Sequence, residues 1–228
     1  MPLLFVLALL PFSSAGAAPQ PPERPDDLPP PPQTKVEKPK AKEPIYQAAC
    51  PALMGDDVDA KILPPLEDDG CGTQSPYQLN AINISNRTIE LASPATVNCA
   101  MATAFIDWVK RVDQLSRTTH GVGIERISTG TSYACRRRNN AKTGKISEHG
   151  FANAIDLTGY VLTDGTQVQL PAAWKAGGKD QKLIRQSHKL GCEIFTTVLG
   201  PEANALHKDH LHLDMGCHGK SCTYKICD

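Results

Sequence analysis

The chain has 228 residues, with 24 basic and 24 acidic side chains, eight cysteines and 19 prolines. A formal net charge of zero argues against a protein that binds nucleic acid or an anionic membrane, because such proteins present an excess of basic side chains. With 40% hydrophobic and 21% charged residues the chain can bury a core, so a globular protein is expected.

Residues 1–17 are typical of a signal peptide. Leu3 to Leu10 form an uninterrupted apolar run, too short for a transmembrane helix, which needs about 20 residues. Small residues follow this run, and cleavage is expected after Ala17. An apolar first strand is the alternative interpretation. No other segment is apolar and long enough to cross a membrane, so we expect a periplasmic or secreted protein with no transmembrane segment in the mature chain.

Residues 18–45 are expected to form a disordered tether. They contain ten prolines, including the run Pro29 to Pro32, and no aromatic residue. Such a segment buries too little apolar surface to offset the entropy lost on ordering, and it favours extended polyproline II conformations. The folded domain is therefore expected to span residues 46–228.

The cysteines all follow the tether. An even number in an exported chain predicts up to four disulfides, although the spacing alone does not determine the pairing. The alternative is a zinc–thiolate site, but the last three cysteines lack the tight C-x2-C spacing of such sites. The eight are Cys50, Cys71, Cys99, Cys135, Cys192, Cys217, Cys222 and Cys227.

Two helices are predicted. Between Val97 and Leu115 apolar side chains recur at helical spacing, which indicates one face turned toward a core. A second helix is expected from Lys179 to Leu190, with Gly191 in the position that caps a helix C-terminus.

The strand predictions comprise one hairpin and three separate strands. The hairpin joins 153–161 to 166–170 through Asp164-Gly165. The separate strands are Ile124–Tyr133, Cys192–Leu199 and Leu211–Met215. Because helices and strands do not alternate regularly, the expected fold class is α+β: a small, mainly antiparallel sheet flanked by helices and stapled by disulfides.

Two segments, Ser147 to Leu157 and His207 to Asp214, contain four of the seven histidines. His210 and His212 are two residues apart on a predicted strand, so both side chains point to one face. One imidazole of that strand, His149 from a loop and Asp156 from the hairpin can together form a zinc site on the sheet. Such a site has two histidines and one carboxylate as ligands, and its fourth position is open for water. The other histidines, His120, His188 and His218, are expected at the surface or in loops.

The motif Ser147-x-His149-x-x-Ala152-x-Ala154-x-Asp156 resembles the SxHxxGxAxD signature of the D-Ala-D-Ala metallopeptidases, with alanine in place of glycine. The later H-x-H resembles the second metal motif of a wider group that includes lysostaphin-type endopeptidases, penicillin-insensitive murein endopeptidases and the hedgehog signalling domain. The most specific resemblance is to the bacterial extensin-like C-terminal domain family. It covers residues 46–228 and is carried by SYACR, SEH, AID and DHLHLD.

This resemblance implies roles for the matching positions. His149, Asp156 and His212 would be the zinc ligands, and His210 would polarise the metal-bound water or stabilise the developing oxyanion. Asp209 occupies the place of a glutamate base in the D-Ala-D-Ala enzymes but is one methylene shorter. His207 is the competing base, because its spacing resembles that of the murein endopeptidases. A polar loop without catalytic function is the alternative for both Asp209 and His207.

Arg136 follows the Ser-Tyr-Ala-Cys segment. In the resembling peptidases an arginine from an equivalent stretch binds a peptide carboxylate, a task that suits the guanidinium fork. A solvated basic loop is the alternative. Cys135 and Cys217 could hold the two walls of the site through disulfides.

The sequence thus favours a zinc-dependent amide hydrolase, an endo- or carboxypeptidase acting on peptidoglycan stem peptides in the cell envelope. The rival hypothesis is a non-catalytic protein that binds the envelope or peptidoglycan and holds a structural or vestigial zinc ion. A protease of protein substrates is a third option.

Overall fold

The computed structural model describes residues 47–228. The expected signal peptide (1–17) and tether (18–45) lie outside the described residues. Within residues 47–228, no helix is long and apolar enough to cross a membrane.

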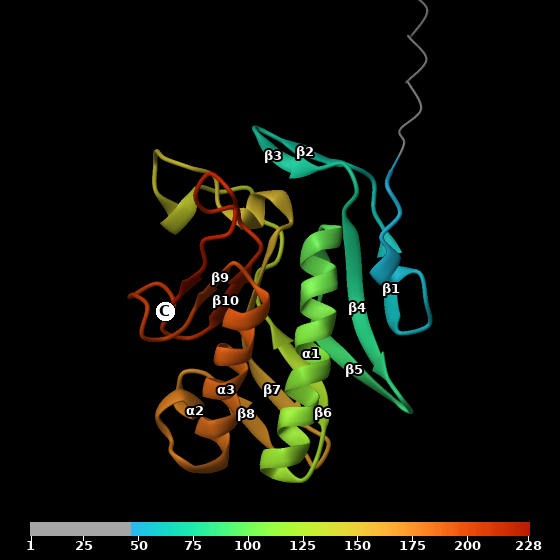
Figure 1. Cartoon of the computed structure of the whole chain (residues 1–228), viewed down its shortest axis with the longest axis vertical. Helices are drawn as coiled ribbons and strands as arrows, with labels where there is room; N and C mark the ends of the chain where they lie inside the picture. The colour runs from blue at the N-terminus through green and yellow to red at the C-terminus, as the bar shows by residue number, and fades with distance from the viewer. Residues whose placement is uncertain (1–46) are drawn as a thin grey trace, which may run out of the picture. The chain divides into compact units, whose positions relative to one another are not determined.

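A nine-stranded sheet forms the centre of the domain, in the order β1-β4-β5-β6-β7-β10-β9-β11, with β8 paired to β7 (Figure 1). Its neighbours are antiparallel except for β5–β6 and β9–β11. The predicted α+β class with a mainly antiparallel sheet is therefore confirmed, although the sheet is mixed. The strands are β1 (Val58–Ile62), β4 (Tyr77–Ile84), β5 (Arg87–Val97), β6 (Ile124–Thr129), β7 (Ala154–Leu162), β8 (Gln167–Gln169), β9 (Thr197–Leu199), β10 (Leu211–Asp214) and β11 (Ile226–Cys227).

The helices α1 (Cys99–His120) and α3 (Gly178–Ile194) pack against each other over this sheet (Figure 1). Trp108 of α1 is fully buried between them, and its indole Nε1 donates a hydrogen bond to the Ser187 carbonyl of α3 at 3.0 Å. This contact satisfies the one polar atom of the largest core side chain. The shorter elements are α2 (Ala172–Lys175), the 3-10 turns η1 (Pro51–Leu53), η2 (Arg138–Asn140) and η3 (Glu148–Phe151), and the hairpin β2 (Leu66–Asp68)–β3 (Cys71–Thr73).

The prediction that Gly191 ends the second helix is wrong, because the helix continues to Ile194. Gly191 is buried, and a Cβ there would lie 3.3 Å from a Val198 methyl group and 3.4 Å from a Leu213 methyl group. The glycine thus allows α3 to approach β9 and β10 closely. As a result, the strand predicted from Cys192 begins only at Thr197.

The other predicted elements are present with shifted ends. The first helix begins two residues later than predicted and continues to His120, and β6 ends at Thr129 rather than at Tyr133. The hairpin around Asp164-Gly165 is confirmed, with Gly165 at φ 86°. The sequence left the role of residues 46–98 open. The structure shows that β1, β4 and β5 extend the main sheet, so this segment is part of one domain.

All eight cysteines lie in the described part of the chain and are paired, which confirms the four expected disulfides. The alternative of a zinc–thiolate site is therefore wrong for the oxidised protein. Four disulfides are typical of an oxidising, non-cytoplasmic compartment. The pairs are Cys50–Cys99, Cys71–Cys135, Cys192–Cys227 and Cys217–Cys222.

Asn98 connects the start of α1 to the loop that precedes β7. Its Oδ1 accepts a hydrogen bond from the Met101 amide at 2.9 Å, and its Nδ2 donates to Asn153 Oδ1 at 2.9 Å and to the Phe151 carbonyl at 3.3 Å. We expect Asn98→Ala to lower the free energy of unfolding by about 1–2 kcal/mol, because it removes the helix cap. Chemical denaturation measures this loss. Asn98→Asp keeps the capping oxygen, so it should lose less; an equal loss would show that the cap is unimportant.

Candidate metal centre

Three side chains that are far apart in the sequence meet at one end of β7 and β10. His149 lies in η3, Asp156 on β7 and His212 on β10, where Asp156 and His212 are direct cross-strand partners. Their side chains therefore share one face of the sheet. His149 Nε2, His212 Nδ1 and Asp156 Oδ1 lie 3.0–3.3 Å from one another. The exposed fractions are 0%, 7% and 7% for His149, Asp156 and His212.

The outer nitrogen of each imidazole bonds an oxygen. His149 Nδ1 donates to the Ser132 carbonyl and His212 Nε2 donates to Asp214 Oδ2, both at 2.9 Å. A neutral imidazole carries one proton, and in both rings that proton lies on the outer nitrogen. His149 Nε2, His212 Nδ1 and Asp156 Oδ1 are then three acceptors with no donor between them. Only a cation or a further proton can hold such atoms together.

The chemistry of this donor set fits a metal ion. Two neutral imidazoles and a carboxylate are common ligands of divalent metals, and oxygen acceptors on their outer nitrogens are typical of bound histidines. At metal–ligand distances of about 2.0–2.1 Å, tetrahedral ligands lie about 3.3 Å apart. The separations of 3.0–3.3 Å observed here are close to this value. His149, Asp156 and His212 therefore form a group that could hold a metal ion.

The charges around the three side chains shift their pKa values. Burial opposes ionisation of Asp156, but its hydrogen bonds with His149 and His212 outweigh burial and hold its pKa well below the usual range. Burial also opposes protonation of His212, yet the carboxylates of Asp156 and Asp214 raise the pKa of this ring to about 9. Without metal, a proton on His212 therefore takes the place of the cation at neutral pH.

His210 and Asp209 lie next to the three candidate ligands. His210 Nε2 is 3.8 Å from Asp156 Oδ1, and His210 Nδ1 bonds Asp209 Oδ1 at 2.9 Å. The Asp209 side chain is 74% exposed. The Asp209 carboxylate is thus exposed and contacts His210, while Nε2 of His210 lies on the side of Asp156.

His207 completes the group of histidines. Its ring centre lies 5.1 Å from that of His210 and 5.7 Å from that of His212, and its Nδ1 bonds Asn204 Oδ1 at 2.8 Å. Burial, together with the charges of His212 and His210, lowers the pKa of His207 to about 4. This ring is therefore neutral at pH 7.

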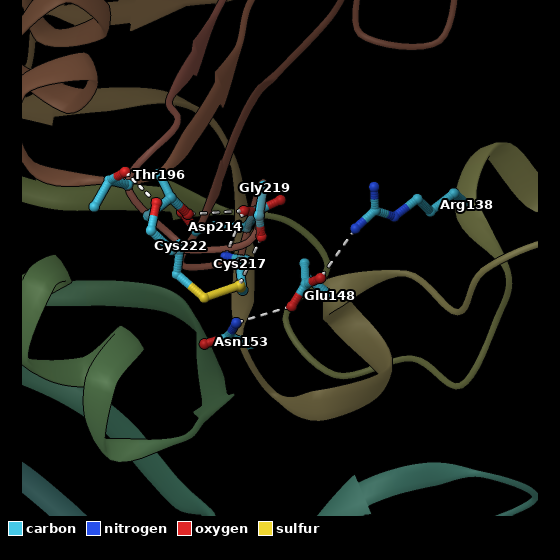
Figure 2. Close-up of a disulfide and its surroundings, with 11 residues drawn as sticks. Arg138, Glu148, Asn153, Thr196, Asp214, Cys217, Gly219 and Cys222 are labelled. Carbon is cyan, nitrogen blue, oxygen red and sulfur yellow. Dashed lines mark hydrogen bonds and ion pairs between the residues drawn. A yellow bond between two sulfur atoms is a disulfide. The ribbon is translucent and has the colours of Figure 1, made fainter.

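A cleft of about 460 Å³ is lined by Asp156, His207, His210 and His212. Arg136 lies on its wall, next to the Cys71–Cys135 disulfide, and its backbone carbonyl accepts a hydrogen bond from the Ser147 amide at 2.9 Å. Among the described residues, no acidic side chain pairs with the Arg136 guanidinium. Arg138, in contrast, bonds Glu148 at 3.1 Å (Figure 2). Arg136 is thus available to a ligand, whereas Arg138 is held within the wall.

A protein-family model described as "Extensin-like protein C-terminus" matches residues 48–228. The chain belongs to this family. No curated protein and no solved structure gives a match. Membership confirms the most specific resemblance found in the sequence, while the relation to D-Ala-D-Ala metallopeptidases and hedgehog domains stays a prediction.

In this extensin-like chain, Ala152 stands where the metallopeptidase signature has glycine. Its φ of 51° lies in the left-handed region that favours glycine, and it terminates η3 directly after the loop of His149. The alanine thus adopts a backbone conformation for which glycine is better suited.

Sequence reasoning gave no role to several residues of the extensin-like site. Asp214 is two residues after His212 on the same strand, so strand alternation already places it on the same face. Glu148 bonds Asn153 at 2.9 Å as well as Arg138, near the Cys217–Cys222 disulfide (Figure 2). No sequence signal indicates the contacts of Glu148 or of the Ser132 carbonyl, because they depend on how loops meet.

The remaining histidines were expected at the surface or in loops, but His120 ends α1 with its side chain only 7% exposed, and His188 lies within α3. His218 lies in a loop, as expected, but it also lines the cleft and bonds Thr197 Oγ1 at 2.6 Å. His120 pairs with Asp180, outside the cleft. His188 lies near Cys192 and Cys227 in a second group of possible metal ligands. Those two sulfur atoms form a disulfide and so cannot bind a metal in the oxidised protein.

Proposed function

We propose that this extensin-like domain is a zinc-dependent amide hydrolase that acts on the peptide stems of peptidoglycan. The observation that carries the proposal is the convergence of three lone-pair atoms beside a cleft that is also lined by three further imidazoles, those of His207, His210 and His218. Asp156 and His212 line the cleft, so an ion bound there is accessible to substrate. Catalytic zinc sites have such an open position, whereas structural zinc sites are closed.

Zinc in a site of this kind acidifies water and polarises a carbonyl group. Among the residues of this chain, we assign proton acceptance to His210, because it is oriented by Asp209 and its Nε2 is close to the ligands. Asp209 is then a positioning residue. His207 is the weaker candidate, because a base with a pKa of about 4 has little driving force for accepting a proton at neutral pH.

The roles of the two histidines can be separated by rate measurements. We expect His210→Ala to lower kcat by about 10²–10⁴-fold, as is typical of the loss of a general base, with zinc still bound. His207→Ala should have a smaller effect on kcat. The reverse order of effects would assign proton acceptance to His207.

Peptidoglycan is proposed as the substrate on three grounds: the resemblance of the metal motifs to murein peptidases, the four disulfides of an exported protein, and the free guanidinium on the cleft wall. Stem peptides carry carboxylates, which a guanidinium binds through two parallel hydrogen bonds. Arg136 is the residue suited to this contact.

We expect Arg136→Ala to raise KM and to lower kcat/KM by about 10–100-fold, since a charge-assisted bidentate contact contributes about 1.5–3 kcal/mol. Arg136→Lys should recover only part of this loss because it cannot form the fork. Steady-state kinetics on a muropeptide measures the effect, and zinc content should not change. An unchanged kcat/KM in Arg136→Ala would show that Arg136 does not bind the substrate and belongs to a solvated basic loop, the alternative interpretation.

The decisive experiment is incubation of the zinc-loaded mature protein with purified peptidoglycan sacculi. Hydrolysis releases soluble fragments with new amino and carboxyl groups, which mass spectrometry identifies, and chelation should stop the release. A protein that sediments with sacculi but releases nothing would support the rival function, a non-catalytic envelope-binding protein.

A further inference from the structure

Asp214 connects the His212 ring to the loop that follows β10. Its side chain is buried, and its two oxygens have different partners. Oδ2 accepts a hydrogen bond from His212 Nε2 at 2.9 Å, and Oδ1 accepts one from the Gly216 amide at 2.8 Å. Because the partner of the outer nitrogen orients a histidine ligand, the orientation of the His212 ring depends on where Asp214 is held. The Gly216 amide therefore influences the metal site without belonging to it.

Gly216 lies in a narrow space between two carboxylates. A Cβ at this position would be 2.9 Å from Glu148 Oε1 and 3.1 Å from Asp214 Oδ1. The Glu148 carboxylate is held in place, because Arg138 pairs with it at 3.1 Å and Asn153 donates a hydrogen bond to it at 2.9 Å (Figure 2). A larger residue in place of the glycine would therefore push the amide away from Asp214.

The loop after Gly216 is closed by the Cys217–Cys222 disulfide (Figure 2). Cys217 directly follows Gly216 in the chain. The two cysteines are only five residues apart, so their disulfide removes little entropy from the unfolded chain compared with a disulfide that closes a longer loop. Its contribution to the stability of the whole domain is therefore expected to be small. It does restrict the backbone next to Gly216.

We propose that the Cys217–Cys222 loop positions the ligand His212 through Gly216 and Asp214, and that opening this disulfide weakens zinc binding. The loop holds the Gly216 amide, the amide holds the Asp214 carboxylate, and the carboxylate orients the imidazole. These are positioning residues, because none of them belongs to the three candidate ligands. The proposal rests on the zinc site of the proposed function but not on hydrolysis.

The zinc affinity of the full mature protein tests this positioning role. The probe is Zn²⁺ alone, in competition with a chromophoric chelator. A double variant, Cys217→Ser with Cys222→Ser, opens the loop and leaves no free thiol there that could bind the ion. It should raise the dissociation constant for zinc by about 10-fold, the lower end of the loss that follows when the outer partner of a metal-bound histidine is disturbed. Gly216→Ala should weaken zinc binding in the same way with the disulfide intact.

The matched control is the double variant Cys192→Ser with Cys227→Ser, which opens the disulfide between α3 and β11. These cysteines are 35 residues apart, so the control should lose more stability toward urea than the variant of the shorter loop. Its zinc affinity should nevertheless stay close to that of the wild type. If the Cys217–Cys222 disulfide served overall stability alone, the control would show the greater loss of zinc affinity.

Asp214→Ala removes the link between the loop and His212. If the loop acts through Asp214, opening the Cys217–Cys222 disulfide in this background should change the zinc affinity little, because residues that act through one another have non-additive effects. A further loss in the triple variant as large as the loss in the wild-type background would show that the loop does not act through Asp214, and would overturn the proposal.

An unchanged zinc affinity in the Cys217→Ser, Cys222→Ser variant would also overturn the positioning role, and so would a wild type that binds no zinc. Circular dichroism of each variant checks that it is folded. If the wild type binds zinc tightly but releases nothing from sacculi, the proposed function fails, while the order of zinc affinities among the variants is unaffected. The two proposals therefore fail through different measurements.

Discussion

Replacing Asp156 by asparagine is expected to reduce tightly bound zinc from about one ion per chain to none and to abolish hydrolysis. The carboxamide has nearly the shape of the carboxylate but carries no charge, so the two imidazoles are left without the anion that completes the site. His212→Ala should have the same effect, because it removes a nitrogen ligand. Elemental mass spectrometry after dialysis against a weak chelator measures the loss.

The matched control is Asp209→Asn, which makes the same chemical change at a carboxylate that contacts His210. Asp209 contacts His210 and not the three ligands, so zinc content should be retained while kcat falls. If Asp156→Asn kept its zinc while folded, the assignment of the metal site would be wrong. If Asp209→Asn lost zinc as fully as Asp156→Asn, the two carboxylates would have no separate roles.

The three candidate ligands could be singled out in the sequence because local rules determine part of their geometry. His210 lies one residue before β10, so strand alternation within β10 applies to His212 and Asp214. The hairpin turn at Asp164-Gly165 places the strand of Asp156. The structure then pairs Asp156 directly with His212. What the sequence did not contain was this register, which depends on how the whole sheet packs.

The remaining features depend on contacts between distant segments, which no local pattern reports. Gly191 has the sequence signature of a helix end, but close packing of α3 on the sheet overrides that signature. The pairing of Cys71 with Cys135 follows from the β2–β3 hairpin meeting the loop of Arg136. Eight cysteines allow 105 pairings, and only the folded chain selects one.

The metal-free protein is expected to lose stability between pH 6.5 and 9. Burial disfavours the charged form of His212, but Asp156 and Asp214 outweigh burial and raise its pKa from 6.5 to about 9. A raised pKa stabilises the folded state fully below pH 6.5, and this contribution is lost as the pH rises toward 9. At 1.36 kcal/mol per pKa unit, the loss is about 3 kcal/mol.

Other shifted groups do not interfere in this range. The pKa values of Asp113, Asp156 and Asp214 are lowered, so their stabilising contributions are lost only in acid. The pKa values of His188 and His207 are also lowered, and their contributions change only below pH 6.5. The slope between pH 6.5 and 9 therefore reports His212.

Zinc should reverse this slope, because the ion replaces the proton on His212. Metal binding requires the neutral imidazole, so the affinity for zinc rises with pH while the proton is being released. Urea denaturation at pH 6.5, 7.5 and 9, with and without zinc, measures both trends. Metal-free protein should become easier to unfold as the pH rises, and zinc-bound protein harder. Parallel curves for the two forms would mean that the proton and the metal do not compete for the His212 ring, and that the three acceptors do not form the metal site.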